Sequence, residues 1–128
     1  MAYSISSRSA LRHYQDLALS SRLEAATPHA LVSLLYEELI ITLDVLKAAT
    51  ANRPSPKPGS SAARASSILV SLEASLDFEQ GGQLAQTLAG IYRTMQAELT
   101  LVIRHQDQAR LAVLREGVTD LYQAWRQI

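Results

Sequence analysis

Two adjacent glycines, Gly81 and Gly82, interrupt the middle of the chain between two segments whose apolar residues recur every three or four positions. That spacing gathers apolar side chains on one face of an α-helix. Because glycine reaches positive φ values without steric cost, a glycine pair readily ends a helix and lets the chain turn back. The pattern predicts that one helix ends near Leu76, that another starts near Gln83, and that the two pack antiparallel.

The composition favours helices throughout the chain. Alanine, leucine, glutamine and arginine are abundant, aromatic residues make up only 5%, and alternating β-branched runs do not occur. With 128 residues the chain is long enough to bury a core as one domain, and its lack of cysteine excludes disulfides and thiolate sites. The predicted fold class is all-α.

Charge and hydropathy exclude several classes of function. Twelve basic and twelve acidic residues cancel, whereas nucleic-acid-binding proteins usually carry a basic excess. No apolar run approaches the roughly 20 residues that span a bilayer. The polar start, Met1 to Ser9, lacks the apolar core of a secretory signal. We therefore expect a cytoplasmic protein that neither inserts into a membrane nor binds nucleic acid.

A helix start stands at Thr27-Pro28, where a hydroxyl can cap the helix and proline fits its first position. The predicted helix runs to about Thr50, and its apolar residues cover more of the circumference than one core contact needs. The expected core stripe is Leu31, Leu34, Leu35, Leu39, Val45 and Leu46, with Ile41 on the opposite flank. An outer apolar strip of Tyr36, Ile40 and Leu43 is the candidate groove for a partner.

Further helices are predicted at residues 62–76, from about Gln83, and at 108–128, after a loop at 52–61 with three alternating prolines. The expected core positions of the last two helices are Leu84, Leu88, Ile91, Met95, Leu99 and Val102, then Leu111, Leu114, Val118, Leu121, Trp125 and Ile128. Together these segments predict an antiparallel four-helix bundle over residues 27–128. Residues 1–26 form an N-terminal arm, either mobile or loosely docked.

No set of residues in the sequence suggests catalysis, a metal site or a cofactor site. The three histidines lack partners at metal-ligand spacing: His13, His29 and His105. The neighbours Glu37 and Glu38 point about 100° apart on a helix and cannot share a proton. Gly81-Gly82 lacks the lysine and the preceding strand of a phosphate loop. We therefore expect a protein that is not an enzyme.

The apolar excess indicates binding to another protein, but it leaves the partner open. A client could lie as a helix in the outer groove. Alternatively, the same surface could pair copies of this chain in a homo-oligomeric scaffold. A histidine phosphotransfer bundle is a third hypothesis, although His105 lacks the nearby glycine and lysine that would accommodate and stabilise a phosphoryl group.

Three stretches resemble the family of flagellin export chaperones, FliS. The first is Ala26 to Glu37, with its Thr-Pro opening, its leucines and the pair Tyr36-Glu37. The second and most specific runs from Leu76-Asp77 through Gly81-Gly82 to Leu88, Ile91-Tyr92 and Met95, and the third is the ending, Leu121 to Trp125. The chain departs from the family pattern at Glu38, Gln83 and Thr87.

The resemblance implies a four-helix bundle that binds the C-terminal segment of flagellin in the cytoplasm. It also implies that the chaperone prevents premature polymerisation and helps to present flagellin to the export gate. In that family, the N-terminal arm takes part in binding and carries an aliphatic residue three positions before a tyrosine. In this sequence these two positions are Leu11 and Tyr14. A weak homodimer remains compatible with this reading.

Overall fold

The computed structural model describes residues 27–51 and 59–128, which form four α-helices and no strand. They are α2 (Pro28–Thr50), α3 (Ser60–Ala74), α4 (Phe78–His105) and α5 (Gln108–Arg126). The chain divides into residues 1–31 and 32–128, and the packing described below lies within the second unit. The all-α class is therefore confirmed. The predicted arm, including Leu11 and Tyr14, lies outside the described residues.

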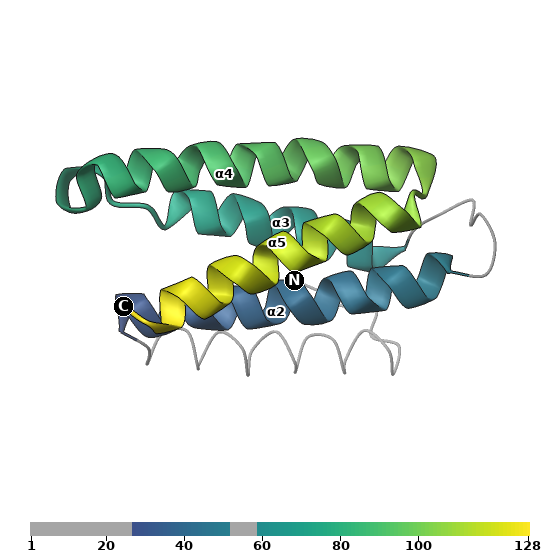
Figure 1. Ribbon diagram of the computed structural model, residues 1–128, viewed down its shortest axis with the longest axis horizontal. Helices are drawn as coiled ribbons and strands as arrows, with labels where there is room; N and C mark the ends of the chain where they lie inside the picture. The colour runs from purple at the N-terminus through teal and green to yellow at the C-terminus, as the bar shows by residue number, and fades with distance from the viewer. Residues whose placement is uncertain (1–26, 52–58) are drawn as a thin grey trace, which may run out of the picture. The chain divides into compact units, whose positions relative to one another are not determined.

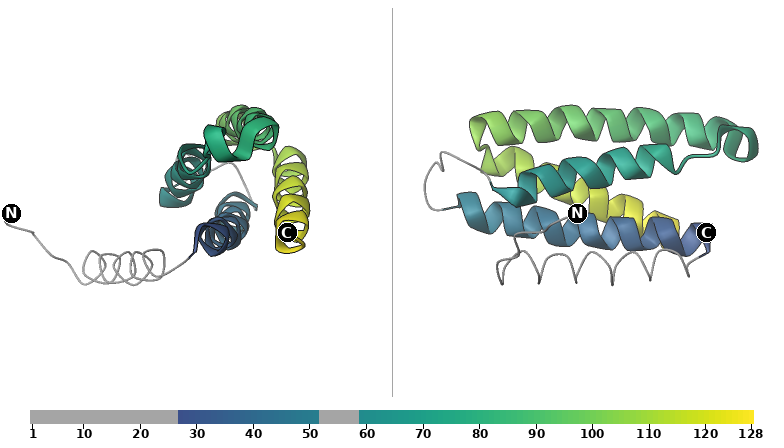
Figure 2. Two further views of the ribbon diagram at one scale, coloured as in Figure 1. Left: turned by 90° about the vertical axis from the view of Figure 1, so that its left-hand side faces the viewer. Right: turned by 180° about the vertical axis from the view of Figure 1, so that it is seen from behind.

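Helices that follow one another along the chain run antiparallel (Figure 1). Helices α2 and α4 point one way, and α3 and α5 point the other (Figure 2). Helix α5 is inclined, so that it starts beside the end of α4 and brings Trp125, near its own end, against Tyr36 of α2. No helix of the described part of the chain is long and apolar enough to cross a membrane.

The start of α2 agrees with the prediction from Thr27-Pro28. The amide of Ala30 donates to Thr27 Oγ1 at 3.2 Å, and Pro28 is the first helical residue. Threonine thus satisfies one of the amides that a helix start leaves without a partner, and proline needs none. The end at Thr50 is also as predicted.

The chain reverses earlier than the glycine pair predicts. Helix α3 ends at Ala74, and Asp77 caps α4 by accepting from the amides of Glu79 and Gln80, each at 3.0 Å. Because this carboxylate satisfies the exposed amides, a helical turn forms before the glycines. Gly82 then kinks α4 with φ 50° and ψ −125°, a conformation that favours glycine.

The core lies between the helices and is built from leucine, small residues and two tyrosines. Among the described residues, the ten largest side chains that are almost completely buried come from all four helices: Tyr36, Leu39, Leu43 and Leu46; Leu69 and Leu72; Tyr92 and Leu99; Leu111 and Val118. Ala62 and Ala65 are also buried, so the first half of α3 presents little bulk to its neighbours. This burial supplies most of the driving force for packing the helices together.

Three expected core positions are instead exposed to solvent: Val45 (53%), Leu84 (54%) and Ile128 (73%). The core face of α2 is centred between Leu39 and Leu43, and at 100° per residue Val45 lies far from that centre. Leu84 lies two residues after the Gly82 kink, and Ile128 lies beyond the end of α5. The helical phase therefore differs from the assumed one at Val45 and Leu84, and Ile128 has no helix to place it on the core face.

Two threonines take buried places on α2 that the apolar pattern does not predict. The Thr42 hydroxyl donates to the carbonyl of Glu38 at 2.6 Å, and the Thr50 hydroxyl donates to that of Leu46 at 2.9 Å. Because each hydroxyl is satisfied one turn back on its own helix, burial leaves no orphaned donor. Thr50 also accepts from the Gln108 amide at 2.6 Å, which ties the end of α2 to the start of α5.

Candidate partner-binding surface

The exposed large apolar side chains of α2 are Ile41 and Val45, at 55% and 53% exposure. They are four residues apart and therefore stand one above the other on the helix. We call this pair the outer α2 strip. Apolar side chains on one exposed stripe of a helix are typical of a surface that another helix covers.

The predicted groove residues are placed differently from the sequence expectation. Tyr36 and Leu43 are each only 1% exposed, so they belong to the core and not to an outer strip. Ile40 is half-buried. The prediction took the wide apolar arc of α2 as evidence of an outer face without fixing where the core face is centred. A helical wheel centred on Leu39 and Leu43 would have identified Ile41 and Val45.

Tyr36 is buried because it lies at the centre of an aromatic cluster. Its ring centroid lies 6.5 Å from that of Tyr92, 6.4 Å from that of Tyr122 and 6.4 Å from that of Trp125. The Tyr36 and Tyr92 hydroxyls share a hydrogen bond of 2.6 Å inside the core. Burial raises the pKa of both phenols, so both stay neutral at physiological pH.

Tyr122 joins this cluster to the helix surface. Its hydroxyl donates to Glu37 Oε1 at 2.6 Å, and that hydrogen bond raises the pKa of Tyr122. The Arg126 guanidinium lies over the Tyr122 ring, 5.5 Å from its centroid. The C-terminal half of α5 is therefore held to α2 by rings and hydrogen bonds.

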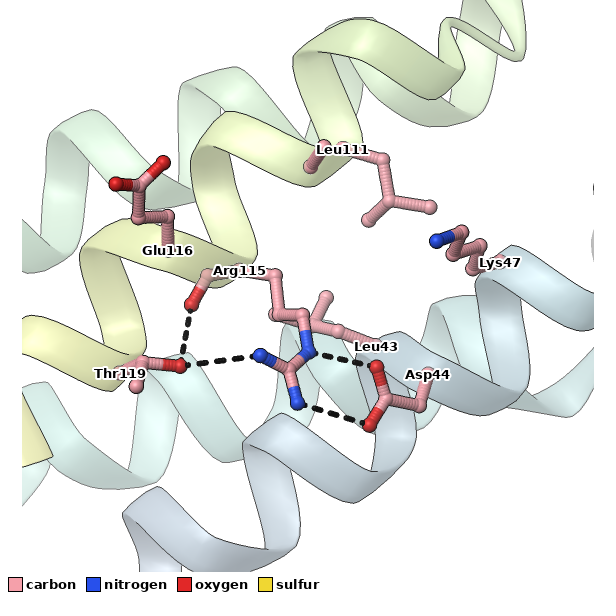
Figure 3. Close-up of a pocket in the computed structure, with 8 residues that line it drawn as sticks. Leu43, Asp44, Lys47, Leu111, Arg115, Glu116 and Thr119 are labelled. Carbon is pink, nitrogen blue, oxygen red and sulfur yellow. Dashed lines mark hydrogen bonds and ion pairs between the residues drawn. The ribbon is translucent and has the colours of Figure 1, made fainter.

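Closer to the start of α5, a cavity of about 160 Å³ lies between α2 and α5 (Figure 3). We call it the α2–α5 cavity. Its lining comprises Leu43, Asp44 and Lys47 from α2, and Leu111, Ala112, Arg115, Glu116 and Thr119 from α5. Leu43 and Leu111 are 1% and 2% exposed, so the base of the cavity is the hydrophobic core itself.

An ion pair spans the α2–α5 cavity. Arg115 Nε donates to Asp44 Oδ1 at 2.7 Å, and Arg115 Nη2 donates to Asp44 Oδ2 at 3.2 Å (Figure 3). The third nitrogen, Nη1, donates to Thr119 Oγ1 at 3.5 Å. The hydrogen bonds from Arg115 hold the pKa of Asp44 below its ordinary value. This two-point contact fixes the Arg115 side chain across the α2–α5 cavity.

The described residues contain no cluster of three or more histidine and acidic side chains that could hold a metal ion. What the surface offers is shape, apolar area and charge. These features suit the binding of a polypeptide segment.

Comparisons with known proteins agree on one family. The family model for the flagellar protein FliS matches residues 10–128. The Flagellar secretion chaperone FliS of Vibrio cholerae is 31% identical over 121 residues, which are 94% of this chain and 89% of that protein. Flagellar secretion chaperone FliSB of Pseudomonas aeruginosa is 27% identical over 116 residues, 91% of this chain and 92% of that protein. The chain therefore belongs to the FliS family of flagellar secretion chaperones.

Proposed function

We propose that this protein binds the C-terminal segment of flagellin in the cytoplasm, prevents its premature polymerisation and aids its delivery to the flagellar export gate. Membership of the FliS family is the observation that carries the proposal. The outer α2 strip and the α2–α5 cavity support it, because both offer apolar area that a helical segment can cover.

The physical basis of this function is the burial of a surface that would otherwise nucleate assembly. Covering apolar area contributes roughly 25 cal/mol per Å² before the costs of ordering the partner are subtracted. A segment that folds as it binds gives up part of this free energy in conformational entropy. The chaperone therefore needs a preformed surface, and the helices of a bundle provide one.

Two predicted contacts from the arm, Leu11 and Tyr14, remain part of the proposal, and so does Ile40. A direct role for Tyr36 or Leu43 would require the core to open, because both side chains are almost fully buried. Their variants would therefore test stability before they test binding. Ile41 and Val45 are the better positions for a first experiment.

The test is whether the chaperone delays flagellin polymerisation, followed by light scattering with monomeric flagellin from the same organism. The wild-type chain should suppress assembly at equimolar concentration. The double variant Ile41→Glu, Val45→Glu should lose most of that effect, because it places two charges in the apolar contact. Val70→Glu on α3 is the matched control, since Val70 is also 53% exposed.

Polymerisation at an unchanged rate beside well-folded wild-type chain would contradict the proposal. For the arm, calorimetric titration of the double variant Leu11→Ala, Tyr14→Ala against the C-terminal flagellin segment is decisive. An unchanged affinity would remove the arm from the mechanism. A stable dimer in sedimentation, with no affinity for flagellin, would favour the homo-oligomeric scaffold.

A further inference from the structure

We infer that the α2–α5 cavity receives one apolar side chain from a helical part of the flagellin segment, with an acidic residue of that helix beside Lys47 and a basic one beside Glu116. This inference rests on the proposed function and adds a site, a register and a charge pattern to it. The lining residues of the cavity carry the argument.

The size and base of the cavity suit an aliphatic or aromatic side chain. Its volume of about 160 Å³ exceeds the space that one water molecule needs. Leu43 and Leu111 form an apolar base that would gain from contact with hydrocarbon. Buried pockets that take one large side chain are where protein interfaces concentrate their binding free energy.

The charges at the rim limit what can accompany that side chain. All three guanidinium nitrogens of Arg115 already donate within the protein, and both Asp44 oxygens accept from Arg115. These contacts hold the two side chains to each other, so neither can turn to a ligand without breaking them. Lys47 and Glu116, by contrast, make no hydrogen bond or ion pair with any residue of the described ranges.

Lys47 and Glu116 lie on opposite sides of the Arg115–Asp44 bridge (Figure 3). A helix that crosses the cavity would meet one cation and one carboxylate with an apolar base between them. On such a helix, residues three or four apart share a face. The complementary pattern is an acidic residue about one turn from the inserted apolar residue and a basic residue about one turn on the other side.

Membership of a family of secretion chaperones favours a client helix over a second copy of this chain as the occupant. Two copies that met with their two-fold axis through this surface would place one cavity against another, and neither would be filled. A client helix presents a ridge of side chains that can enter the hollow. Complementary rim charges would then fix the direction in which that helix lies.

The first test fills the cavity from the protein side. Ala112 lines the cavity and is exposed, so Ala112→Phe places a ring at its mouth. Ala109→Phe is the matched control, because Ala109 is exposed on the same helix and does not line the cavity. Calorimetric titration with the C-terminal flagellin segment should show affinity lowered about tenfold or more by Ala112→Phe. Ala109→Phe should stay within about twofold of wild type.

Equal affinity of wild type and Ala112→Phe would overturn the inference while leaving the proposed function intact. Failure of the wild-type chain to bind the segment would instead remove the proposed function itself. Sedimentation of both variants without client tests whether a second copy of this chain occupies the cavity. A dimer that only Ala112→Phe disrupts would assign the cavity to that second copy and overturn the inference.

The second test addresses the charges and does not depend on filling the cavity. Lys47→Glu should weaken binding, and the loss should shrink as salt is raised. Replacing each acidic residue of the flagellin segment in turn by lysine should identify one position at which affinity for Lys47→Glu is restored. If no single replacement restores it, the assigned contact at Lys47 is wrong.

Discussion

Helices α2 and α5 meet in two stretches that are built in different ways. Near the start of α2, Tyr36 packs against Tyr122 and Trp125, and Tyr122 hydrogen-bonds to Glu37. About two turns further along α2, the same two helices are joined across a cavity by Asp44 and Arg115. One stretch is filled by aromatic rings, whereas the other is spanned by an exposed ion pair.

This difference separates a part of the interface that stabilises the fold from a part that we propose to bind flagellin. Buried rings and satisfied hydroxyls contribute several kcal/mol and tolerate little change. Exposed ion pairs contribute about 1 kcal/mol or less, so the groove beneath them can be occupied or altered without unfolding the bundle. Predictions about stability should therefore differ sharply between the two stretches.

The largest effect is expected in the aromatic stretch. Tyr92→Ala removes a ring that is only 1% exposed and should lower the free energy of unfolding by about 3–5 kcal/mol. Lys47→Ala at the cavity should change it by less than about 0.5 kcal/mol, as surface substitutions do. Urea denaturation followed by circular dichroism measures both. Similar losses of unfolding free energy for the two variants would contradict the difference that we infer between the two stretches.

The hydroxyl pair inside the aromatic cluster gives the next effect. Tyr36→Phe leaves the Tyr92 hydroxyl buried without its 2.6 Å partner, and should cost about 1–3 kcal/mol of unfolding free energy. Adding Tyr92→Phe removes the orphaned group, so the double variant should recover much of that loss. The same denaturation measurements form a double-mutant cycle. Simple addition of the two single losses would show that the hydroxyls do not depend on each other.

A smaller loss is expected where the aromatic cluster reaches the surface. Tyr122→Phe removes the hydrogen bond to Glu37 but keeps the ring against Tyr36, so stability should fall by about 1 kcal/mol. Glu37→Gln keeps an acceptor oxygen and should cost less. Thermal unfolding can rank the two variants. A larger loss for Glu37→Gln would indicate that the charge of Glu37 matters more than its hydrogen bond.

The smallest effect is expected at the ion pair over the cavity, where Asp44→Asn should cost no more than about 1 kcal/mol at neutral pH. Arg115 lowers the pKa of Asp44 in the folded protein below the ordinary value of 3.8. The stabilisation is therefore complete above that ordinary value and is lost as the pH falls through the lower folded value. Denaturation of wild type and Asp44→Asn across acidic pH should show their difference vanish. A difference that grows on acidification would contradict this sign.

The sequence predicted the helices well because their signals are local. Thr27-Pro28 marked the start of α2, and the positions Leu88, Leu99 and Val102 on α4 are buried as the periodicity indicated. The glycine pair was less reliable, since Asp77 could start a helix before it. The Asp77 carboxylate accepts hydrogen bonds from the first amides of α4 and so sets where the helix starts, whereas the glycines only permit a turn.

The candidate partner-binding surface was harder to predict because it depends on contacts between distant parts of the chain. Arg115 and Asp44 are separated by 71 positions, and no spacing rule joins them. Tyr36 looked available on a wide apolar helix, yet three rings from two other helices cover it. Periodicity identified α2 as a helix with an excess of apolar residues, but which of its faces is buried depends on its neighbours.

The central claim is that this FliS-family chain recognises the C-terminal segment of flagellin. The most direct measurement is calorimetric titration of the wild-type chain with monomeric flagellin and with flagellin that lacks this segment. We expect saturable one-to-one binding to the intact subunit and none to the truncated one. Equal binding to both, or no binding to either by well-folded protein, would contradict the account.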